Sequence, residues 1–437
     1  MRLKRVEIEN FRAVEYVALD LNPSLTVFHG DNAMGKTSAL EAIAVGLRPI
    51  NEILSNPDVG ADDKNNIGDT DRRHQSLFTS IALTSEDNVR WDCSIGYKNN
   101  IFTVNSRART LIGLKELRTK LSSFSNNPEN ASENFPVFAY YNTDRAVFVT
   151  PQRRRDFRSK FLRLDALDRA LSEKMDFRTV IEWFHAKENE ELRQQRERKD
   201  FDYHQNDLEA VRRAICSMIP GSSNPHIELS PLRFMVSLKT DDGTEEKLSL
   251  EELSGGYRIM LALVADLARR MAQGNPHLDD PLQSEAIVLI DEVDLHLHPS
   301  WQQRVLVDLM RTFPKTQFIV TTHSPQVLST VRPEHIVRFS RENGEIVVGP
   351  ASAETYGEES SHVLEAEMGV NSRPPENEFV KLLSDYFDLI DSDEYDSKDA
   401  HDLRKKLESL SPRNTGLDRA DVNITRREVL KSMESDL

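Results

Sequence analysis

The feature that most constrains the fold is a glycine-rich turn between an apolar segment and a periodic one. Residues 28–43 read FHGDNAMGKTSALEAI and contain the spacing Gly30-x-x-x-x-Gly35-Lys36-Thr37. Average residue usage produces this spacing by chance on the order of 1–2% of the time in a chain of this length. Such a turn binds phosphate when a strand precedes it and a helix follows it, because backbone N–H groups and the helix N-terminus then surround the oxygens. The sequence therefore favours an α/β fold with a phosphate-binding loop.

The residue types in this loop indicate what it binds. Lys36 is expected to reach the β- and γ-phosphates of a nucleotide, and the Thr37 hydroxyl is expected to bind Mg²⁺. Short strands are predicted before the loop. A helix is predicted over 37–48, with Pro49 ending it. ATP and Mg²⁺ are the expected ligands.

A second motif lies far along the chain. The run AIVLIDE (286–292) is apolar on both faces, as a central parallel strand must be, and it ends in Asp291 and Glu292. A carboxylate at the tip of such a strand can hold Mg²⁺ through water, and its neighbour can polarise the attacking water. Together with the glycine loop, this pair indicates hydrolysis as well as binding.

Two further motifs are less specific when taken alone. Ser254 stands in LSGG before a predicted helix, where a serine is a good N-cap, and capping alone is a sufficient reason for it. His323 ends the apolar run QFIVTTHS (317–324), and a lone histidine at a strand end is more often structural. The helix predicted over 299–312 joins this strand to the preceding one, which makes a βαβ unit.

The order of the four motifs resembles the head of the ABC-type ATPases, in the branch that includes the SMC, RecF and OLD proteins. That family implies an α/β fold: a P-loop parallel sheet flanked by helices, plus an antiparallel β subdomain. It also implies that two heads close face to face around two nucleotides, so that Ser254 of one subunit reaches the γ-phosphate held by the other. His323 corresponds to the switch histidine of the family. Asn32 is expected near the γ-phosphate.

The resemblance completes the set of expected site residues. The nucleotide-binding residues are Gly30, Asn32, Gly35, Lys36, Thr37, Ser38, Ser254, Gly255, Gly256 and Asp291; the catalytic residues are Glu292 and His323; the ligands of Mg²⁺ are Thr37 and Asp291.

A narrower resemblance comes from DEVDLHLHPSWQ (291–302), IENFRAV near the start, PVFAYYNTDR (136–145) and an acidic helical tail. These are similar to the ATPase subunits of Septu anti-phage defence systems, which also occur beside retrons. This resemblance implies a homo-oligomer built from head-to-head dimers, with an HNH nuclease as a partner supplied in trans. It places Asp294 in the loop that crosses the dimer seam. His296 and His298 could be interpreted as a metal pair, but the family carries them without a metal and no third ligand is evident nearby.

The sequence departs from the family pattern at two places. Ala33 stands where the phosphate loop usually has an inner glycine, and we expect its Cβ to affect the rate of turnover but not binding. No clear glutamine marks the Q-loop after PVFAYYNT, and Gln152 is a candidate.

We predict four regions. They are 1–150 (the first half of the head), 151–225 (a short helical arm insertion), 226–345 (the second half of the head) and 346–437 (an acidic helical region). In the last region, Phe379, Leu383, Tyr386, Phe387 and Ile390 recur at helical spacing. This stripe fits a dock for a partner about as well as packing against the chain's own head. Asp391 and Asp393 lack the Val/Ile-rich strands that a Toprim nuclease would need, so we interpret them as a solvated charge run.

Charge and composition limit the remaining possibilities. The formal net charge of -16 argues against nonspecific coating of nucleic acid, although the basic segments 105–120 and 152–164 could contact DNA or could be solvated helix faces. No stretch approaches the roughly 18 apolar residues of a membrane helix. With Cys93 and Cys216 as the only cysteines, and no signal-like start, the cytoplasm is the expected location. The alternatives to a defence ATPase are a RecF-like DNA repair ATPase and an ATP-locked scaffold with negligible turnover.

Overall fold

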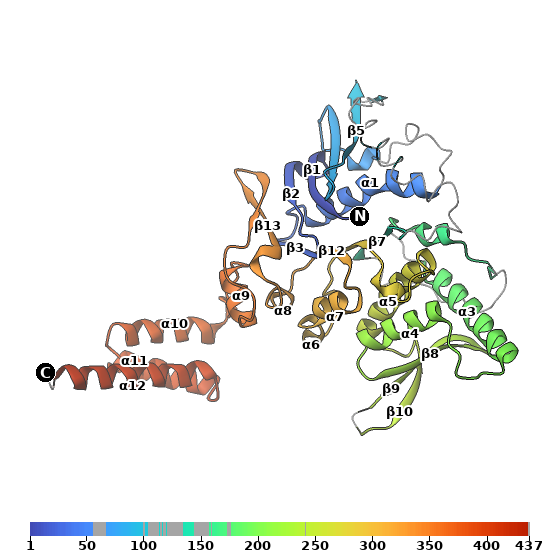
Figure 1. Ribbon diagram of the computed structural model, residues 1–437. Coiled ribbons are helices and arrows are strands. Elements are labelled where there is room, and N and C mark those ends of the chain that lie inside the picture. The colour runs from blue at the N-terminus through green and yellow to red at the C-terminus, as the bar shows by residue number, and fades with distance from the viewer. Residues whose placement is uncertain are drawn as a thin grey trace. The chain divides into compact units, whose positions relative to one another are not determined.

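The chain divides into two compact units, Met1–Val363 and Leu364–Leu437. The computed structural model describes residues 1–55, 67–98, 101–103, 113, 116, 119, 134–143, 157–158, 160–172, 176–240 and 242–435. The first unit contains three sheets with helices around them, and the second is helical in its described residues (Figure 1). Within those ranges, every helix is too short or too polar to cross a membrane.

The central sheet of the first unit is mainly parallel, and its strands run in the order β14-β13-β3-β12-β11-β7. Only β14 is antiparallel to its neighbour among these six strands. The strands are β3 (Leu25–Gly30), β7 (Val137–Tyr141), β11 (Ala286–Ile290), β12 (Thr316–Thr321), β13 (Ile336–Glu342) and β14 (Glu345–Pro350). Strands β7, β11 and β12 are buried along their whole length, which explains their unbroken apolar runs.

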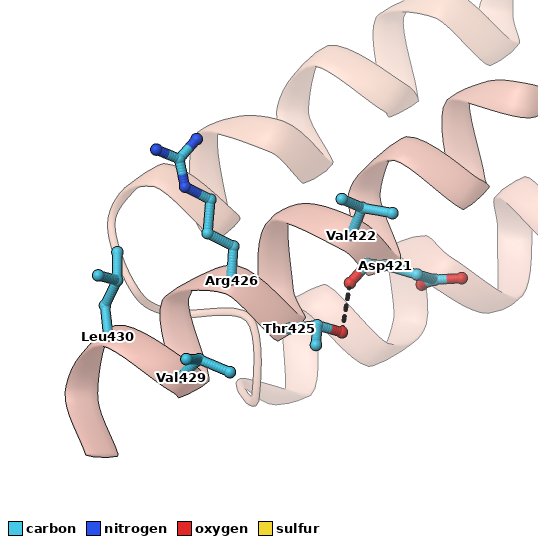
Figure 2. Close-up of a pocket in the computed structure, with 6 residues that line it drawn as sticks. All are labelled: Asp421, Val422, Thr425, Arg426, Val429 and Leu430. Atoms are coloured by element: carbon cyan, nitrogen blue, oxygen red, sulfur yellow. Dashed lines mark hydrogen bonds between the residues drawn. The ribbon is translucent and has the colours of Figure 1, made fainter. Parts of the chain in front are cut away.

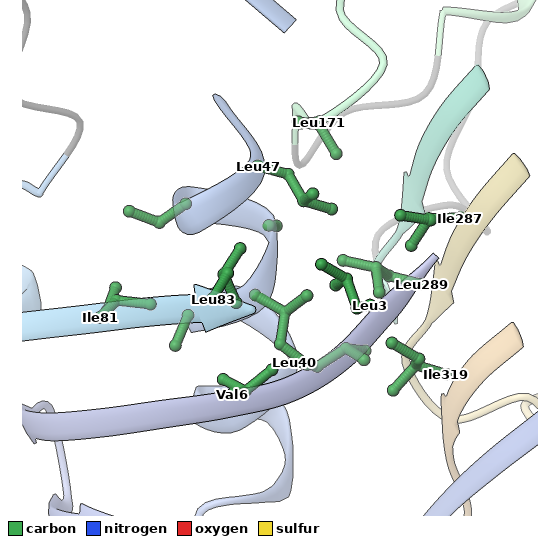
Figure 3. Close-up of a cluster of buried hydrophobic side chains, with 14 of the residues drawn as sticks. Leu3, Val6, Leu40, Leu47, Ile81, Leu83, Leu171, Ile287, Leu289 and Ile319 are labelled. Atoms are coloured by element: carbon green, nitrogen blue, oxygen red, sulfur yellow. The ribbon is translucent and has the colours of Figure 1, made fainter. Parts of the chain in front are cut away.

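A five-stranded antiparallel sheet forms the predicted β subdomain, with the strand order β2-β1-β4-β5-β6. Its strands are β1 (Leu3–Phe11), β2 (Val14–Asp20), β4 (Phe78–Ser85), β5 (Arg90–Lys98) and β6 (Ile101–Thr103). Figure 3 shows Leu40, from the helix α1 (Lys36–Ser55), close to Val6 and Leu83 of this sheet. Leu289 and Ile319 of the central sheet belong to the same buried cluster. One apolar core therefore joins both sheets to the helix that follows the phosphate loop, and the predicted fold class is confirmed.

Helix α1 is longer than the sequence predicts. Pro49 lies inside it, so the predicted end at this residue is wrong. A proline in a helix removes one hydrogen bond and strains the preceding turn. Beyond it, however, Ile50, Ile53 and Leu54 are all buried in the core, and this burial offsets the cost.

The described helices of the predicted arm pack against a small sheet, most of which lies beyond the predicted boundary at residue 225, and we call the two together the arm lobe. Its helices are α3 (Phe177–Arg198) and α4 (Asn206–Met218), and the strands of its sheet, in the order β10-β9-β8, are β8 (Ser222–Leu229), β9 (Leu232–Lys239) and β10 (Glu245–Ser249). The rings of Phe184 and Phe234 meet edge-on at 5.2 Å and join α3 to this sheet. The insertion predicted to be helical contains a break, because Lys199, which follows α3, has the left-handed φ of +53°.

The structure describes further helices in the first unit. They are α5 (Gly255–Gly274), α6 (Pro299–Gln302), α7 (Val305–Thr312), α8 (Pro325–Leu328) and α9 (Ser360–Ala366), which spans the boundary with the second unit, with short 3-10 turns at Asp69–Asp71, Arg163–Leu167, Pro281–Gln283 and Pro333–His335. The helix predicted over 299–312 is thus two helices. Strand β14 belongs to the central sheet, so the head extends beyond the predicted boundary at residue 345.

The second unit is built from α10 (Glu378–Asp391), α11 (Lys398–Leu410) and α12 (Thr415–Ser435). The apolar stripe predicted on α10 is buried here: Phe379, Leu383, Tyr386 and Ile390 form one cluster with residues of α11 and α12. Because the unit itself covers this stripe, the expectation that it is a dock for a partner is wrong. The exposed apolar side chains of this unit include Val422, Val429 and Leu430 of α12, which Figure 2 shows.

Candidate nucleotide-binding site

The phosphate loop lies between β3 and α1, as its spacing predicts. Gly30 pairs with Phe339 of β13, and a Cβ on Gly30 would lie 2.1 Å from the Phe339 carbonyl oxygen, so no other residue fits there. Ala33 has φ +63°, a left-handed conformation that glycine adopts more easily. The loop therefore keeps the backbone shape of a phosphate cradle even where the inner glycine is replaced.

Lys36 lies across the inside of this loop. Its Nζ donates to the carbonyl oxygens of Gly30 and Asp31, at 2.8 Å each, and the residue is only 5% exposed. Burial lowers the pKa of Lys36 below its ordinary value, against the opposing effect of Asp291, Asp31 and Glu292. A nearly buried ammonium ringed by carbonyl oxygens is a suitable group to receive an anionic phosphate.

Thr37 and Asp291 meet although they lie 254 positions apart in the chain. The Thr37 hydroxyl is 3.1 Å from both carboxylate oxygens of Asp291, which is 2% exposed. The Thr321 hydroxyl donates to the same carboxylate at 2.6 Å. A hydroxyl and a buried carboxylate are hard oxygen donors, so these residues fit the octahedral Mg²⁺ that the family implies.

The two predicted catalytic residues follow the ends of the neighbouring strands β11 and β12. Glu292 has φ +47°, and its backbone N–H donates to the Thr321 hydroxyl at 2.7 Å. Such backbone strain is common where a side chain must be aimed at a reaction centre. His323 is half-buried, and burial lowers its pKa, helped by Lys36 and opposed by Asp294, Glu292 and Asp291. These charges all belong to the site, which places the histidine beside the loop and the strand-end carboxylates.

The LSGG segment lies at the start of α5. Ser254 caps the helix by accepting the Tyr257 N–H at 3.5 Å, and it is exposed together with Gly255. Gly256 is required by close packing, because a Cβ there would lie 2.9 Å from the His296 carbonyl oxygen. The predicted capping role of Ser254 is therefore confirmed, and the helix end remains open on its outer side.

The loop after β11 is held by Thr322, which follows β12, and by a cap at the start of α6. The Thr322 hydroxyl donates to Asp294 at 2.5 Å, and the His298 Nδ1 lies 2.9 Å from the Ser300 hydroxyl while accepting the Ser300 N–H to cap α6. Among the described residues no group of three His, Cys, Asp or Glu side chains is placed to hold a metal. The contact between His298 and the Ser300 N–H is a helix cap.

Several residues of the site are not singled out by the sequence. Thr321, Thr322, Gln302 and Ser324 tie the strand ends together, and the pair of threonines just before His323 is the one signal available. Asn32, Thr37 and Ser38 lie in or just after the loop, and the first two are exposed. Gln152 and most of the basic segment 105–120 lie outside the described residues, as do residues 152–156 and 159 of the basic segment 152–164. In the described part of that second segment, Arg163 is only 4% exposed and its Nε donates to the Gly274 carbonyl, so this basic side chain is buried and not part of a surface stripe.

Comparison with known proteins gives a family and several relatives. A family model described as "AAA domain, putative AbiEii toxin, Type IV TA system" matches residues 25–329, more than half of the chain. The "Retron Ec83 probable ATPase" of Escherichia coli is 30% identical over 473 aligned positions, covering 93% of this chain and 83% of that protein. The "Septu protein PtuA" of Bacillus mycoides (strain KBAB4) is 46% identical over 76 residues, which cover 17% of this chain and 10% of that protein. Among solved structures, the SMC head domain from Thermotoga maritima has a TM-score of 0.41 at 17% identity and covers 81% of this chain and 100% of that one.

Proposed function

The chain belongs to the family of AAA domains described as "putative AbiEii toxin, Type IV TA system", as an ABC-type ATPase related to those of retrons and Septu systems, and from this premise we propose that it hydrolyses ATP at a head-to-head dimer seam and thereby regulates an HNH nuclease in an anti-phage defence complex. The observation that carries the proposal is the junction of Thr37 and Asp291. It joins the phosphate loop to the strand that ends in Glu292. A site that only bound nucleotide would need the Asp291 carboxylate for the metal but would not need a second carboxylate, that of Glu292.

The residues divide the work of phosphoryl transfer among them. Lys36 neutralises the β- and γ-phosphates, and the loop's N–H groups orient them. Thr37 and Asp291 would hold Mg²⁺, which when bound neutralises charge on the same phosphates. Glu292 polarises the attacking water as a general base. His323, whose pKa is lowered chiefly by burial, can donate a hydrogen bond from its ring to the γ-phosphate.

The dimer is supported by the open end of α5. Ser254 and Gly255 are exposed, and the polar atoms of the serine bond within the first turn of its own helix. In a head-to-head arrangement this helix end faces the phosphate of the opposite subunit, where its N-terminal dipole favours an anion. ATP then holds two heads together, and its hydrolysis releases them.

The nuclease is supplied in trans in this proposal. The likeness to the retron and Septu proteins supports it. The acidic pair that could suggest a nuclease in this chain is solvent-exposed: the Asp391 and Asp393 side chains are 67% and 47% exposed, and Arg427 of α12 lies 2.7 Å from the first and 3.2 Å from the second. Hydrolysis would therefore act on the target through the partner.

The ATPase proposal is tested with three variants of the purified protein. Wild type should release phosphate from ATP, and Glu292→Gln should lower the rate at least about 100-fold while retaining ATP. With ATP, that variant should run at twice the mass of the 49.9 kDa monomer in light scattering, or at a larger even multiple, and adding Ser254→Arg should return it toward the monomer. Lys36→Ala should lose ATP binding. Equal phosphate release by wild type and Glu292→Gln would favour the ATP-locked scaffold instead.

The defence role needs a separate test. The protein is purified from its native locus and copurifying proteins are identified. The complex is then assayed for nuclease activity with and without ATP. An HNH protein whose activity changes with ATP supports the proposal; recovery of replication or repair proteins without nuclease activity supports the RecF-like alternative.

A further inference from the structure

A chain of contacts joins the start of α5 to the loop of His323 within one subunit. This inference rests on the proposed function, in which the start of α5 and the loop of His323 face different nucleotides. The start of α5 faces the nucleotide bound by the opposite subunit, and His323 faces the nucleotide bound by its own subunit. We propose that Trp301 and Gln302, on the short helix α6, connect them, so that nucleotide bound against α5 sets the position of His323 at the other site of the dimer. Both are positioning residues, since neither is among the residues assigned to touch nucleotide.

The first link is an aromatic contact. The Tyr257 and Trp301 rings meet edge-on, with centroids 4.5 Å apart and planes at 62°. One residue earlier in α5, Gly256 lies directly against the His296 backbone. The first turn of α5 therefore rests on the segment from 296 to 301, and a shift of this turn must be followed by that segment or must break the packing.

The second link is the side-chain amide of Gln302. Its oxygen accepts the Ser324 hydroxyl at 2.7 Å, and its nitrogen donates to the Leu297 carbonyl at 2.9 Å. Both ends of the amide are thus engaged, one by the loop after β11 and one by the residue that follows His323. A fixed amide between two loops transmits displacement, because neither loop can move alone without losing a hydrogen bond.

The loop that carries His323 is also held through Thr322, the residue that precedes the histidine. The Ser324 backbone N–H donates to the Thr322 hydroxyl at 3.0 Å, and that hydroxyl donates to Asp294. The residues on each side of His323 are therefore both fastened to the loop between β11 and α6. Since a misplacement of about 1 Å at a reacting group can cost on the order of 100-fold in rate, this fastening is sufficient to control turnover.

Gln302→Leu tests the second link. It removes both hydrogen bonds while keeping a side chain of similar size, and we expect kcat to fall about 10- to 100-fold with the Kd for ATP within about twofold of wild type. Gln303→Leu is the matched control, because Gln303 is the exposed next residue, and its kcat should be unchanged. Ser324→Thr keeps the hydroxyl that donates to Gln302 and should retain most of the wild-type kcat. A loss of folding in Gln302→Leu would not by itself explain this difference between the two variants.

Tryptophan fluorescence tests the first link directly. The chain has 3 tryptophans, and Trp91 and Trp183 are fully buried, whereas Trp301 is half-buried beside Tyr257. In a Glu292→Gln background, ATP should change the emission. The change should disappear in Trp301→Phe, which keeps an aromatic ring against Tyr257, and also in Ser254→Arg, which still binds ATP at Lys36.

The outcomes separate this inference from the proposed function. If Glu292→Gln traps ATP and dimerises but Gln302→Leu keeps the wild-type kcat, or if the emission change survives Trp301→Phe, the link through α6 is wrong and the ATPase proposal stands. If no variant binds ATP, both fail together.

Discussion

At the scale of single residues, Ala33 shows how far the phosphate loop can depart from its usual composition. Its left-handed conformation costs an L-residue about 1 kcal/mol, and a β-branched side chain considerably more. We therefore expect Ala33→Val to weaken ATP binding at least about tenfold, while Ala33→Gly keeps the wild-type Kd, both measured by calorimetry. A Val variant with unchanged affinity would show that the loop does not need this conformation to bind.

The same scale shows what sequence can and cannot predict about the site. Lys36, Thr37, Asp291 and Glu292 are recognisable because residue type and spacing alone single them out. Gln302 and Ser324 are not, because the hydrogen bond between them depends on how two loops from different strands meet. Each looks like an ordinary polar residue until the strand order of the central sheet is known.

At the scale of secondary structure, the contact between α3 and β8 makes the arm lobe sensitive to pH. The Glu188 carboxylate accepts the Ile227 N–H at 3.3 Å and 3.2 Å, and it is 15% exposed. Burial raises the pKa of Glu188 from 4.5 to about 7, although Arg212 and the Ile227 N–H oppose the shift. Because the folded pKa exceeds the unfolded one, the stability that this group contributes is complete below pH 4.5 and is lost as the pH rises through about 7.

Glu188→Gln should remove this loss. We expect the variant to melt about 2–4 °C above wild type at pH 8, with a smaller difference at pH 5, in thermal denaturation followed by circular dichroism. Glu190→Gln is a control of opposite sign. Burial raises the pKa of Glu190, but Gln205 and Lys187 lower it by more, so the pKa lies below its ordinary value. A Glu188→Gln variant that is less stable than wild type at pH 8 would contradict the prediction.

Element boundaries are harder to predict than element types. Strands β3, β11 and β12 and the helix α5 follow their apolar patterns and caps closely, because local sequence decides them. The sequence predicts a helix end at Pro49, yet α1 continues because the residues after it are buried by strands distant in sequence. The segment over 299–312 is interrupted at Gln303 and Arg304, where α6 ends and Arg304, with φ -128°, precedes α7. The continuation of α1 past Pro49 depends on tertiary contacts, and local propensity does not contain them.

At the scale of the whole molecule, the two units have separate apolar cores. The periodic apolar stripe on α10 does not show by itself whether it belongs to such a core or forms a docking surface for a partner. The cluster around Ile390 and Leu407 is drawn from α10, α11 and α12, whereas the core around α1 is drawn from the two sheets of the head. Burial of the α10 stripe inside its own unit needs two partner helices, whose weak apolar patterns give no clear signal in the sequence. Separate cores imply that one unit can unfold without the other.

This independence gives the last prediction. Ile390 is fully buried in the second unit, so Ile390→Asp places a carboxylate without a partner in an apolar core, at a cost of several kcal/mol. Limited proteolysis with mass spectrometry should then degrade residues 364–437 and leave a resistant fragment that contains the head, with the Kd for ATP within about twofold of wild type. Leu410→Asp is the control, because Leu410 is 48% exposed and the unit should stay resistant. Loss of ATP binding in Ile390→Asp, with Leu410→Asp unaffected, would mean that the head depends on the second unit for its fold, since no residue of the site lies in that unit among those described.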